Sequence, residues 1–109
     1  WFRTDDEGNF IWPGFGDNMR VLEWILKRCD GSVDAIESAI GYLPHTEDIN
    51  IDGLEGVTAD TVRKLLEVDT DSWLSDISNI RSFYAQIGDR VPAELYSELD
   101  ALENRLKES

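Results

Sequence analysis

Two apolar stripes in the C-terminal part of the chain constrain its fold more than any other feature. Apolar side chains recur at steps of four and three residues in the segment 69–88, and leucines repeat this spacing in the segment 92–109. The residues are Trp73, Ile77, Ile80, Tyr84 and Ile87 in the first stripe and Leu95, Leu99, Leu102 and Leu106 in the second. Gly88 marks the end of the first helix, and Pro92 suits the first turn of the next. Because about four residues join the stripes, they predict an antiparallel helical hairpin.

A further helix is predicted over the stretch "DNMRVLEWILKRCDG", with Asp17 as its N-cap and Gly31 as its C-terminal stop. Its apolar stripe, which we expect to face the core, consists of Val21, Leu22, Ile25, Leu26 and Cys29. Cys29 is therefore interpreted as a small core residue rather than a nucleophile. A shorter helix is predicted with Thr58 as its N-cap, and "SAIGYLP" could form a short edge strand that ends at Pro44.

The N-terminal residues predict a β-hairpin. Two short aromatic runs, Trp1–Arg3 and Asn9–Trp12, flank the turn-like stretch "TDDEG", in which Gly8 can adopt a positive φ. The predicted fold class is therefore α+β and mostly helical. An N-terminal β-hairpin and an aromatic loop, in residues 1–18, are followed by a tail of about four helices in residues 19–109, of which the last two form an antiparallel hairpin.

The charge balance excludes several classes of partner. The chain carries 10 Lys and Arg against 23 Asp and Glu, a net charge of −13. Such a surface repels nucleic-acid backbones and anionic membranes, so we expect neither as a partner. Cys29 is the only cysteine, which excludes a disulfide framework and fits a reducing, cytoplasmic location. No apolar run is long enough for a membrane span and no signal peptide is visible, and the opening at Trp1 is interpreted as a cut from a longer protein.

Motifs for catalysis or metal binding are not predicted. His45 is the sole histidine, follows Pro44 in a loop that we expect to be exposed, and has no serine or cysteine motif directed at it. No phosphate-binding G-x-x-x-x-G-K-[ST] loop is present. The stretch "DINIDG" matches the first half of an EF-hand loop, but Ala59 occupies the position of the bidentate glutamate. We therefore expect a turn with Asx hydrogen bonds there rather than a calcium site.

The stretch "FIWPGFGDN", which ends at Asn18, is the strongest functional candidate. It places Phe10, Trp12 and Phe15 on a segment that Pro13 and two glycines keep irregular. Flat rings on a rigid loop can stack on a planar heterocycle, at about 1–3 kcal/mol per base, and the amide of Asn18 can read the edge of such a ring. A packed loop that only covers the core, and an aromatic cage for a proline-rich peptide, are the alternatives.

The stretch "WFRTDDEGNFIWPGFGDN" followed by "RVLEWI" resembles the C-terminal part of GTP-dependent phosphoenolpyruvate carboxykinases. The family pattern reads approximately N-W-F-R-x-x-x-x-G-x-F-L-W-P-G-F-G-E-N-x-R-V-L. This chain departs from it at Ile11, Asp17 and Met19, where the family has Leu, Glu and usually Ser. Further along, "IGYLP" and "INIDGL" are similar to the family's "IGYIP" and "LNLKGL". The resemblance is dense over Trp1–Trp24 and looser in the final helices.

The resemblance implies a function for the aromatic loop. The family converts oxaloacetate and GTP to phosphoenolpyruvate, carbon dioxide and GDP with manganese or magnesium, in gluconeogenesis and anaplerosis. By resemblance, the residues that bind the guanine base are Phe2, Phe10, Phe15, Gly16, Asp17 and Asn18. Phe2 and Phe15 would face the two sides of the ring with Phe10 at its edge, and Asn18 would read a polar edge of the base.

The resemblance also implies which parts of the enzyme lie outside the chain. The phosphate loop, metal ligands, substrate-binding arginines and mobile lid of the family lie upstream, so we expect no catalytic residue and no metal ligand here. Residues 1–109 would form the C-terminal segment of the nucleotide-binding domain. Its partners would be a guanine nucleotide, GTP or GDP, and the upstream part of the same polypeptide. The alternative is a helical interaction module whose aromatic loop binds a proline-rich peptide or a protein surface.

Overall fold

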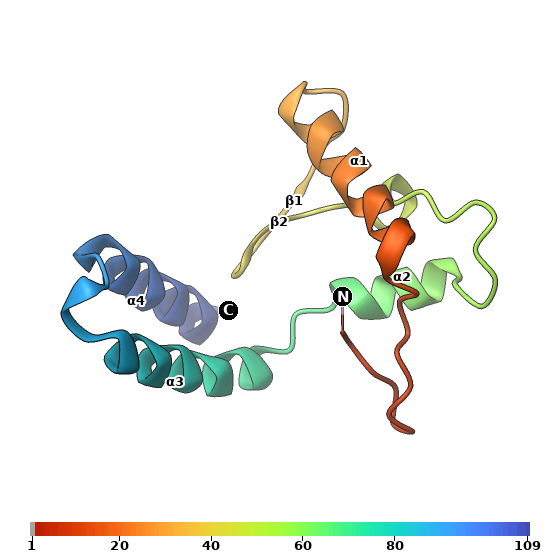
Figure 1. The fold of residues 1–109 in the computed structure, drawn as a ribbon. Coiled ribbons are helices and arrows are strands. Elements are labelled where there is room, and N and C mark those ends of the chain that lie inside the picture. Colours follow the sequence, from red (N-terminus) through yellow and green to blue (C-terminus); the bar gives the residue numbers. More distant parts are fainter. Residues whose placement is uncertain (1) are drawn as a thin grey trace. The chain divides into compact units, whose positions relative to one another are not determined.

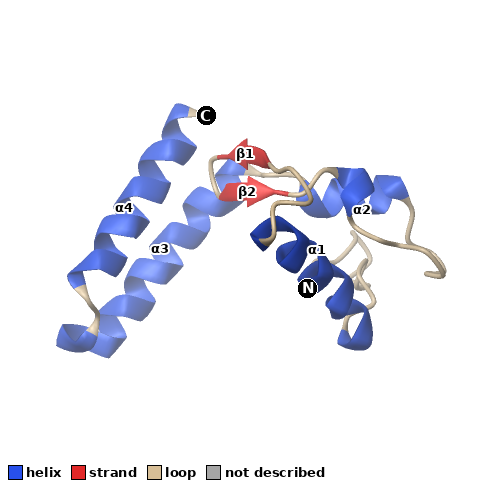
Figure 2. Cartoon of the chain, turned by 90° about the horizontal axis from the view of Figure 1, so that it is seen from above, coloured by secondary structure: helices blue, strands red, loops and turns tan. Residues whose placement is uncertain are grey.

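The computed structural model describes residues 2–109, which divide into two compact units. The first unit consists of the residues up to Glu37 together with Tyr42–Glu67, and the second of Ser38–Gly41 together with Val68–Ser109. Four α-helices and a two-stranded sheet occur in this described part of the chain (Figure 1, Figure 2). The predicted fold class, α+β and mostly helical, is confirmed. No helix within residues 2–109 is long and apolar enough to cross a membrane.

The second unit is built on two helices, α3 (Thr70–Ile87) and α4 (Ala93–Glu108), which lie side by side in both views (Figure 1, Figure 2). Its buried side chains are Ile77, Leu99 and Leu106. The two predicted stripes therefore meet along most of their length, although Ile87 and Leu95 at the turn are exposed. Gly88 ends α3 with a φ of 74°, as predicted, because glycine adopts this conformation without a steric penalty.

Charged side chains join α3 to α4 along one side. Arg81 of α3 contacts Asp100 at 2.7 Å and Glu103 at 2.5 Å on α4, and Lys107 contacts Glu103 at 2.6 Å. The pKa of the Glu103 carboxyl lies below its ordinary value because Lys107 and Arg81 both donate to it. The pKa of Arg81 is raised by the same pairing, with Asp100 as the larger cause. Pairs this exposed contribute little to stability individually, but the two contacts of Arg81 favour one register of α3 against α4.

Two helices and a cluster of buried hydrophobic side chains make up the centre of the described part of the first unit. Helix α1 runs Met19–Cys29 and helix α2 runs Ala59–Leu66. The buried members of this cluster are Trp12, Trp24, Ile49, Val57 and Val62. They come from the aromatic loop, from both helices and from the segment between the helices. The core of this unit therefore holds the aromatic loop against α1 and α2.

The structure confirms the predicted N-terminal residue of one helix and differs from the prediction for two others. Thr58 caps α2 as predicted, since its hydroxyl accepts from the Thr61 N–H while the Thr61 hydroxyl accepts from the Thr58 N–H. The prediction of Asp17 as the cap of α1 is wrong: Asn18 directly precedes α1, without a side-chain cap bond. Pro92 is the N-cap of α4 rather than its first helical residue.

Two hairpins occur within residues 2–109. In the predicted N-terminal one, Thr4 and Phe10 form an antiparallel bridge, and the Ile11 N–H donates to the Arg3 carbonyl at 3.1 Å. The part of this prediction that falls on Trp1 lies outside the described residues. The pairing is thus shorter than two regular strands.

The second hairpin pairs β1 (Ile36–Ser38) with β2 (Gly41–Leu43). The predicted single strand over residues 38–44 is correct only for β2, which Pro44 follows directly, because the stretch also contains the end of β1 and the turn between the strands. The Ser38 hydroxyl donates to the Gly41 carbonyl at 2.7 Å across the turn. Sequence reasoning missed β1 because "IES" is too short to show an alternating pattern.

The face that α1 buries is not the predicted one. Trp24 is buried in the core of the first unit with Val21 packed beside it. The other residues of the predicted stripe, Leu22, Ile25, Leu26 and Cys29, are exposed. The interpretation of Cys29 as a core residue is therefore wrong. Periodicity identifies apolar positions on a helix, but α1 is apolar on two sides and the sequence does not say which side is covered.

Candidate functional site

The backbone of the aromatic loop holds one ring out into solvent. Gly14 has φ 72° and ψ −158°, a conformation that is essentially restricted to glycine. Phe15 follows with a φ of 49°, a left-handed conformation that costs an L-residue about 1–2 kcal/mol. Its side chain is 95% exposed, so burial of the ring does not compensate for this strain. Strain at an exposed aromatic residue is typical of a binding site.

Three phenylalanines of the hairpin and loop present ring surface to solvent. Phe2 and Phe10 are 79% and 66% exposed, and Phe15 is more exposed than either. The rings of Phe2 and Phe10 lie with centroids 6.1 Å apart and planes tilted by 59°, a contact that leaves ring faces open. Within residues 2–109, no ring contact involves Phe15. These aromatic faces are therefore accessible to a planar ligand.

Asn18 is oriented by a buried tryptophan. The indole N–H of Trp12 donates to the Oδ1 atom of Asn18 at 2.8 Å. Because an indole can only donate, the atom that faces Trp12 must be the amide oxygen. Trp12 is itself packed in the core, so this contact fixes both the position and the orientation of the amide. The Asn18 NH₂ group is left for other partners, as no hydrogen bond from it occurs in the described part of the chain.

A second contact ties the loop to the turn around Asn50. The Arg20 Nε–H donates to the Asp17 carboxylate at 3.1 Å, and Arg20 Nη1 donates to the Asn50 carbonyl at 3.0 Å. Asp17 thus lies in the 3-10 turn η1 (Phe15–Asn18) with its carboxylate engaged by Arg20. Gly16 in the same turn is exposed, with nothing within 4 Å of the place where a Cβ would lie. Its backbone is therefore open to a ligand.

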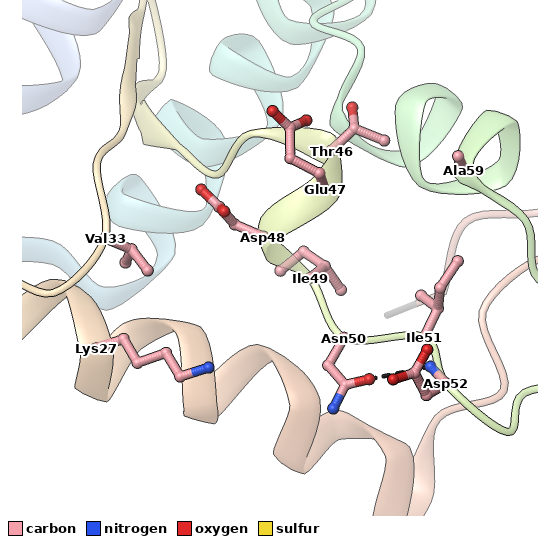
Figure 3. Close-up of a pocket in the computed structure, with 10 residues that line it drawn as sticks. All are labelled: Lys27, Val33, Thr46, Glu47, Asp48, Ile49, Asn50, Ile51, Asp52 and Ala59. Carbon is pink, nitrogen blue, oxygen red and sulfur yellow. Dashed lines mark hydrogen bonds between the residues drawn. The ribbon is translucent and has the colours of Figure 1, made fainter.

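A hollow of about 390 Å³ lies between α1 and the segment 46–52 (Figure 3). Its walls carry three carboxylates, Glu47, Asp48 and Asp52, and the ammonium of Lys27. The Asn50 side chain accepts from the Asp52 N–H at 3.0 Å, which is the Asx turn predicted from the sequence (Figure 3). Within residues 2–109, no three His, Cys, Asp or Glu side chains are grouped to hold a metal. None of the predicted base-binding residues lines this hollow.

A second hollow, of about 380 Å³, adjoins the ring of Phe10. Its lining comes from the hairpin and loop and from the segment that leads into α2: Asp5, Phe10, Ile11, Pro13, Glu55, Gly56, Val57 and Thr61. A ligand that contacts Phe10 can therefore extend into this hollow.

Sequence reasoning missed the two residues that shape the loop. Trp12 was recognisable as one of three aromatics, but its six-residue separation from Asn18 follows no regular period. Arg20 lies three residues after Asp17, a helical spacing that does indicate an ion pair. His45, predicted to be exposed, is half-buried in front of a short 3-10 turn.

Comparison with known proteins identifies the family of the chain that carries this loop. Residues 1–105 match a family model described as the phosphoenolpyruvate carboxykinase C-terminal P-loop domain. The chain belongs to the GTP-dependent phosphoenolpyruvate carboxykinase family. The resemblance drawn from the aromatic loop is thereby confirmed.

Curated relatives extend well beyond this chain. Phosphoenolpyruvate carboxykinase [GTP] of Treponema pallidum (strain Nichols) is 47% identical over 110 residues, which cover 100% of this chain and 18% of the relative. The protein of the same name from Chlamydia muridarum is 46% identical over 109 residues, with coverage of 98% and 18%. That of Paenarthrobacter aurescens is 44% identical over 106 residues, with coverage of 97% and 17%. The chain therefore spans less than a fifth of the length of these relatives.

Proposed function

We propose that this chain forms the guanine-binding edge of an enzyme that converts oxaloacetate and GTP to phosphoenolpyruvate, carbon dioxide and GDP. The observation that carries the proposal is the ring of Phe15, which is 95% exposed on a strained backbone. The relatives are named for GTP, and an enzyme that selects one nucleotide needs a surface specific to its base. Stacking on an aromatic side chain contributes about 1–3 kcal/mol per base.

The loop supplies both kinds of contact that a base requires. Phe2 and Phe15 are proposed to face the two sides of the guanine ring, with Phe10 at its edge. The Asn18 NH₂ group is proposed to donate to an acceptor on the base, such as O6 or N7 of guanine. This choice follows from the bond of Trp12 to the amide oxygen, which leaves the donor end of the amide free.

Gly16 is proposed to contribute through its backbone, and Asp17 by holding the turn rather than by contacting the base with its carboxylate. Gly16 has open space around its Cα, so a ligand can approach the main chain closely. The Asp17 carboxylate is engaged by Arg20 and therefore acts by holding the turn. Both residues lie between the stacking ring of Phe15 and the amide of Asn18.

The triphosphate and the metal are assigned to the rest of the polypeptide. A net charge of −13 repels a triphosphate, and the sequence contains no G-x-x-x-x-G-K-[ST] stretch. The family uses manganese or magnesium, but residues 2–109 offer no group of three suitable side chains. The described residues thus do not fit such a metal site, and we assign no metal ligand to them.

A matched pair of variants tests the proposal in the full-length polypeptide. Phe15→Ala removes the proposed stacking ring, and Phe83→Ala removes a phenylalanine that is 57% exposed on α3. The loss of one stacking contact should weaken GTP binding about 5- to 150-fold in Phe15→Ala. Phe83→Ala should change it by less than about two-fold, since exposed side chains away from a site contribute little. Isothermal titration with GTP measures both.

The same titration separates the proposal from its alternative. Equal affinities for GTP in Phe15→Ala and in the unchanged protein would contradict a stacking role. If Phe15→Ala instead abolished binding of a proline-rich peptide and left GTP binding unchanged, the loop would be a peptide-binding cage.

A further inference from the structure

Helix α1 carries an apolar face that the described part of the chain leaves exposed. Its residues are Met19, Leu22, Ile25, Leu26 and Cys29. Successive members are separated by three, three, one and three residues, so they lie on one side of the helix. Leu26 and Met19 are 68% and 62% exposed. We call this set the outer face of α1.

The outer face contrasts with the other sides of the same helix. Trp24 and Val21 on the inner side belong to the core of the first unit. The charged residues of α1 are engaged within that unit: Arg20 with Asp17 and the Asn50 carbonyl, Lys27 with Glu23 at 3.1 Å, and Arg28 over the ring of Tyr42. The outer face contains no charged residue in a chain of which 30% is charged. An exposed apolar patch that is rimmed by polar residues marks an interaction surface.

We propose that the outer face of α1 docks onto the segment of the same polypeptide that precedes Trp1 and carries the phosphate loop of this domain. The curated relatives that match this chain are more than five times as long, since it covers 17–18% of their length. The matching family model describes a P-loop domain, of which this chain supplies the C-terminal portion without the loop motif. A large stretch of polypeptide is therefore available to cover the face.

Charge argues against a second copy of the chain as the occupant. Each copy carries a net charge of −13, so pairing two α1 helices would bring two strongly acidic bodies together. A segment of the same polypeptide is tethered to the face and needs no such association. Burying exposed leucine, isoleucine and methionine side chains contributes about 25 cal/mol per Å² of apolar surface.

The docking has a consequence for the aromatic loop. Asn18 and η1 (Phe15–Asn18) run directly into α1 at Met19. A helix clamped between its own core and the preceding segment would therefore fix the loop relative to the phosphate loop. The proposal rests on the family and on the exposure of α1, and it holds whether or not the loop binds guanine.

Two natural side chains at opposite ends of the outer face serve as chemical probes. Met19 is the only methionine and Cys29 the only cysteine in these 109 residues. Labelling of Cys29 with N-ethylmaleimide and oxidation of Met19 with peroxide are followed by mass spectrometry on the full-length polypeptide, without nucleotide. Docking predicts that both reactions in the native protein are at least about ten-fold slower than in urea, because they require local opening.

Each outcome decides the proposal. Rates within about three-fold of the urea-unfolded rates would overturn it, since an exposed face reacts without opening. Protection that disappears on dilution would assign the face to a second copy and would also overturn it. Protection that is independent of protein concentration supports it. None of these rates depends on GTP, so the result is separate from that of the guanine-binding test.

Matched variants on adjacent positions locate the protection. Leu26→Gln alters the outer face, and Lys27→Gln alters a neighbouring residue on the charged side. Leu26→Gln should raise the native Cys29 labelling rate at least about five-fold, and Lys27→Gln should leave it within about two-fold. Equal rates in both variants would overturn the assignment to this face. If Leu26→Gln does not fold, the labelling of the unchanged protein still decides.

Discussion

Two buried tryptophans in the first unit differ in the fate of their indole N–H. Trp12 and Trp24 are 5% and 8% exposed and belong to the same core. Trp12 donates to Asn18, whereas the buried Trp24 Nε1 has no partner in the described part of the chain. An unsatisfied buried donor costs about 1–3 kcal/mol, while a formed hydrogen bond contributes about 1 kcal/mol. The same substitution at the two positions therefore has different consequences.

Trp12→Phe should destabilise the chain by at least about 1 kcal/mol more than Trp24→Phe. Both changes remove similar apolar area, but only the first breaks a hydrogen bond, and the second removes an unpaired donor. Urea unfolding followed by circular dichroism gives the two free energies of unfolding. Equal losses would mean that the bond from Trp12 to Asn18 contributes nothing to stability.

The amide of Asn18 should discriminate bases through its donor end. Because Trp12 occupies Oδ1, the free NH₂ group pairs with an acceptor, and O6 and N7 are common to guanine and hypoxanthine. Asn18→Ala in the full-length polypeptide should therefore raise the Kd for GTP and ITP by the same factor, about 5- to 100-fold. Competition titrations with the two nucleotides measure this. A larger loss for GTP would show that Asn18 reads the exocyclic amine instead.

At the scale of single residues, the sequence predicted which side chains are exposed better than it predicted which side chains contact one another. The exposed rings of Phe10 and Phe15 follow from glycine and proline positions that keep the loop irregular. The bond between Trp12 and Asn18 and the contact of Arg20 with Asn50 join residues without a regular spacing. Such contacts depend on how the core closes, which a single sequence does not specify.

The helices were predictable to the extent that their partners are within the chain. The stripes of α3 and α4 cover each other, so spacing alone gave the correct buried residues Ile77, Leu99 and Leu106. The stripe of α1 was identified equally well, but its outer face has no partner in the described residues, and the assignment of that face to the core was wrong. The error arises because α1 has two apolar sides.

The α3–α4 pair should lose stability on acidification through Glu103. Its pKa lies below the ordinary value because Lys107 and Arg81 donate to the charged form. The unfolded chain binds this proton more readily than the folded one, so the contribution is complete above the ordinary glutamate value of about 4.3 and is lost as the pH falls through the lower folded pKa. The melting temperature should therefore fall between about pH 5 and pH 3.

Glu103→Gln provides the control for this pH dependence. It removes the titrating group, so the melting temperature of the variant should change less over the same pH range. The other carboxylates remain in both proteins, and their common effect cancels in the comparison. Identical pH profiles would show that the contacts of Glu103 with Arg81 and Lys107 add no stability.

At the scale of the whole molecule, the net charge favours the proposal that this chain contacts the base of a nucleotide and not its phosphates. The chain has exposed rings and a free amide donor on one loop, and an excess of 13 negative charges overall. Arg3 and Arg20 are the cations nearest this loop in sequence, and both donate within the first unit, Arg3 to the Glu67 carbonyl and Arg20 to Asp17. Under the proposed function, the neutral base is therefore the part of the nucleotide that we expect this chain to bind.

The 109-residue chain should accordingly bind guanosine about as well as GTP, and both weakly. Two stacked rings at about 1–3 kcal/mol each must exceed the cost of association, which leaves about −4 kcal/mol at best, a Kd on the order of millimolar. Added salt should slightly improve GTP binding by screening repulsion and leave guanosine unchanged. Ligand-observed NMR with both compounds, at low and high salt, measures these effects. If GTP bound much more tightly than guanosine and salt weakened it, the chain would contain a phosphate site of its own, because added salt weakens binding only where attraction between opposite charges drives it.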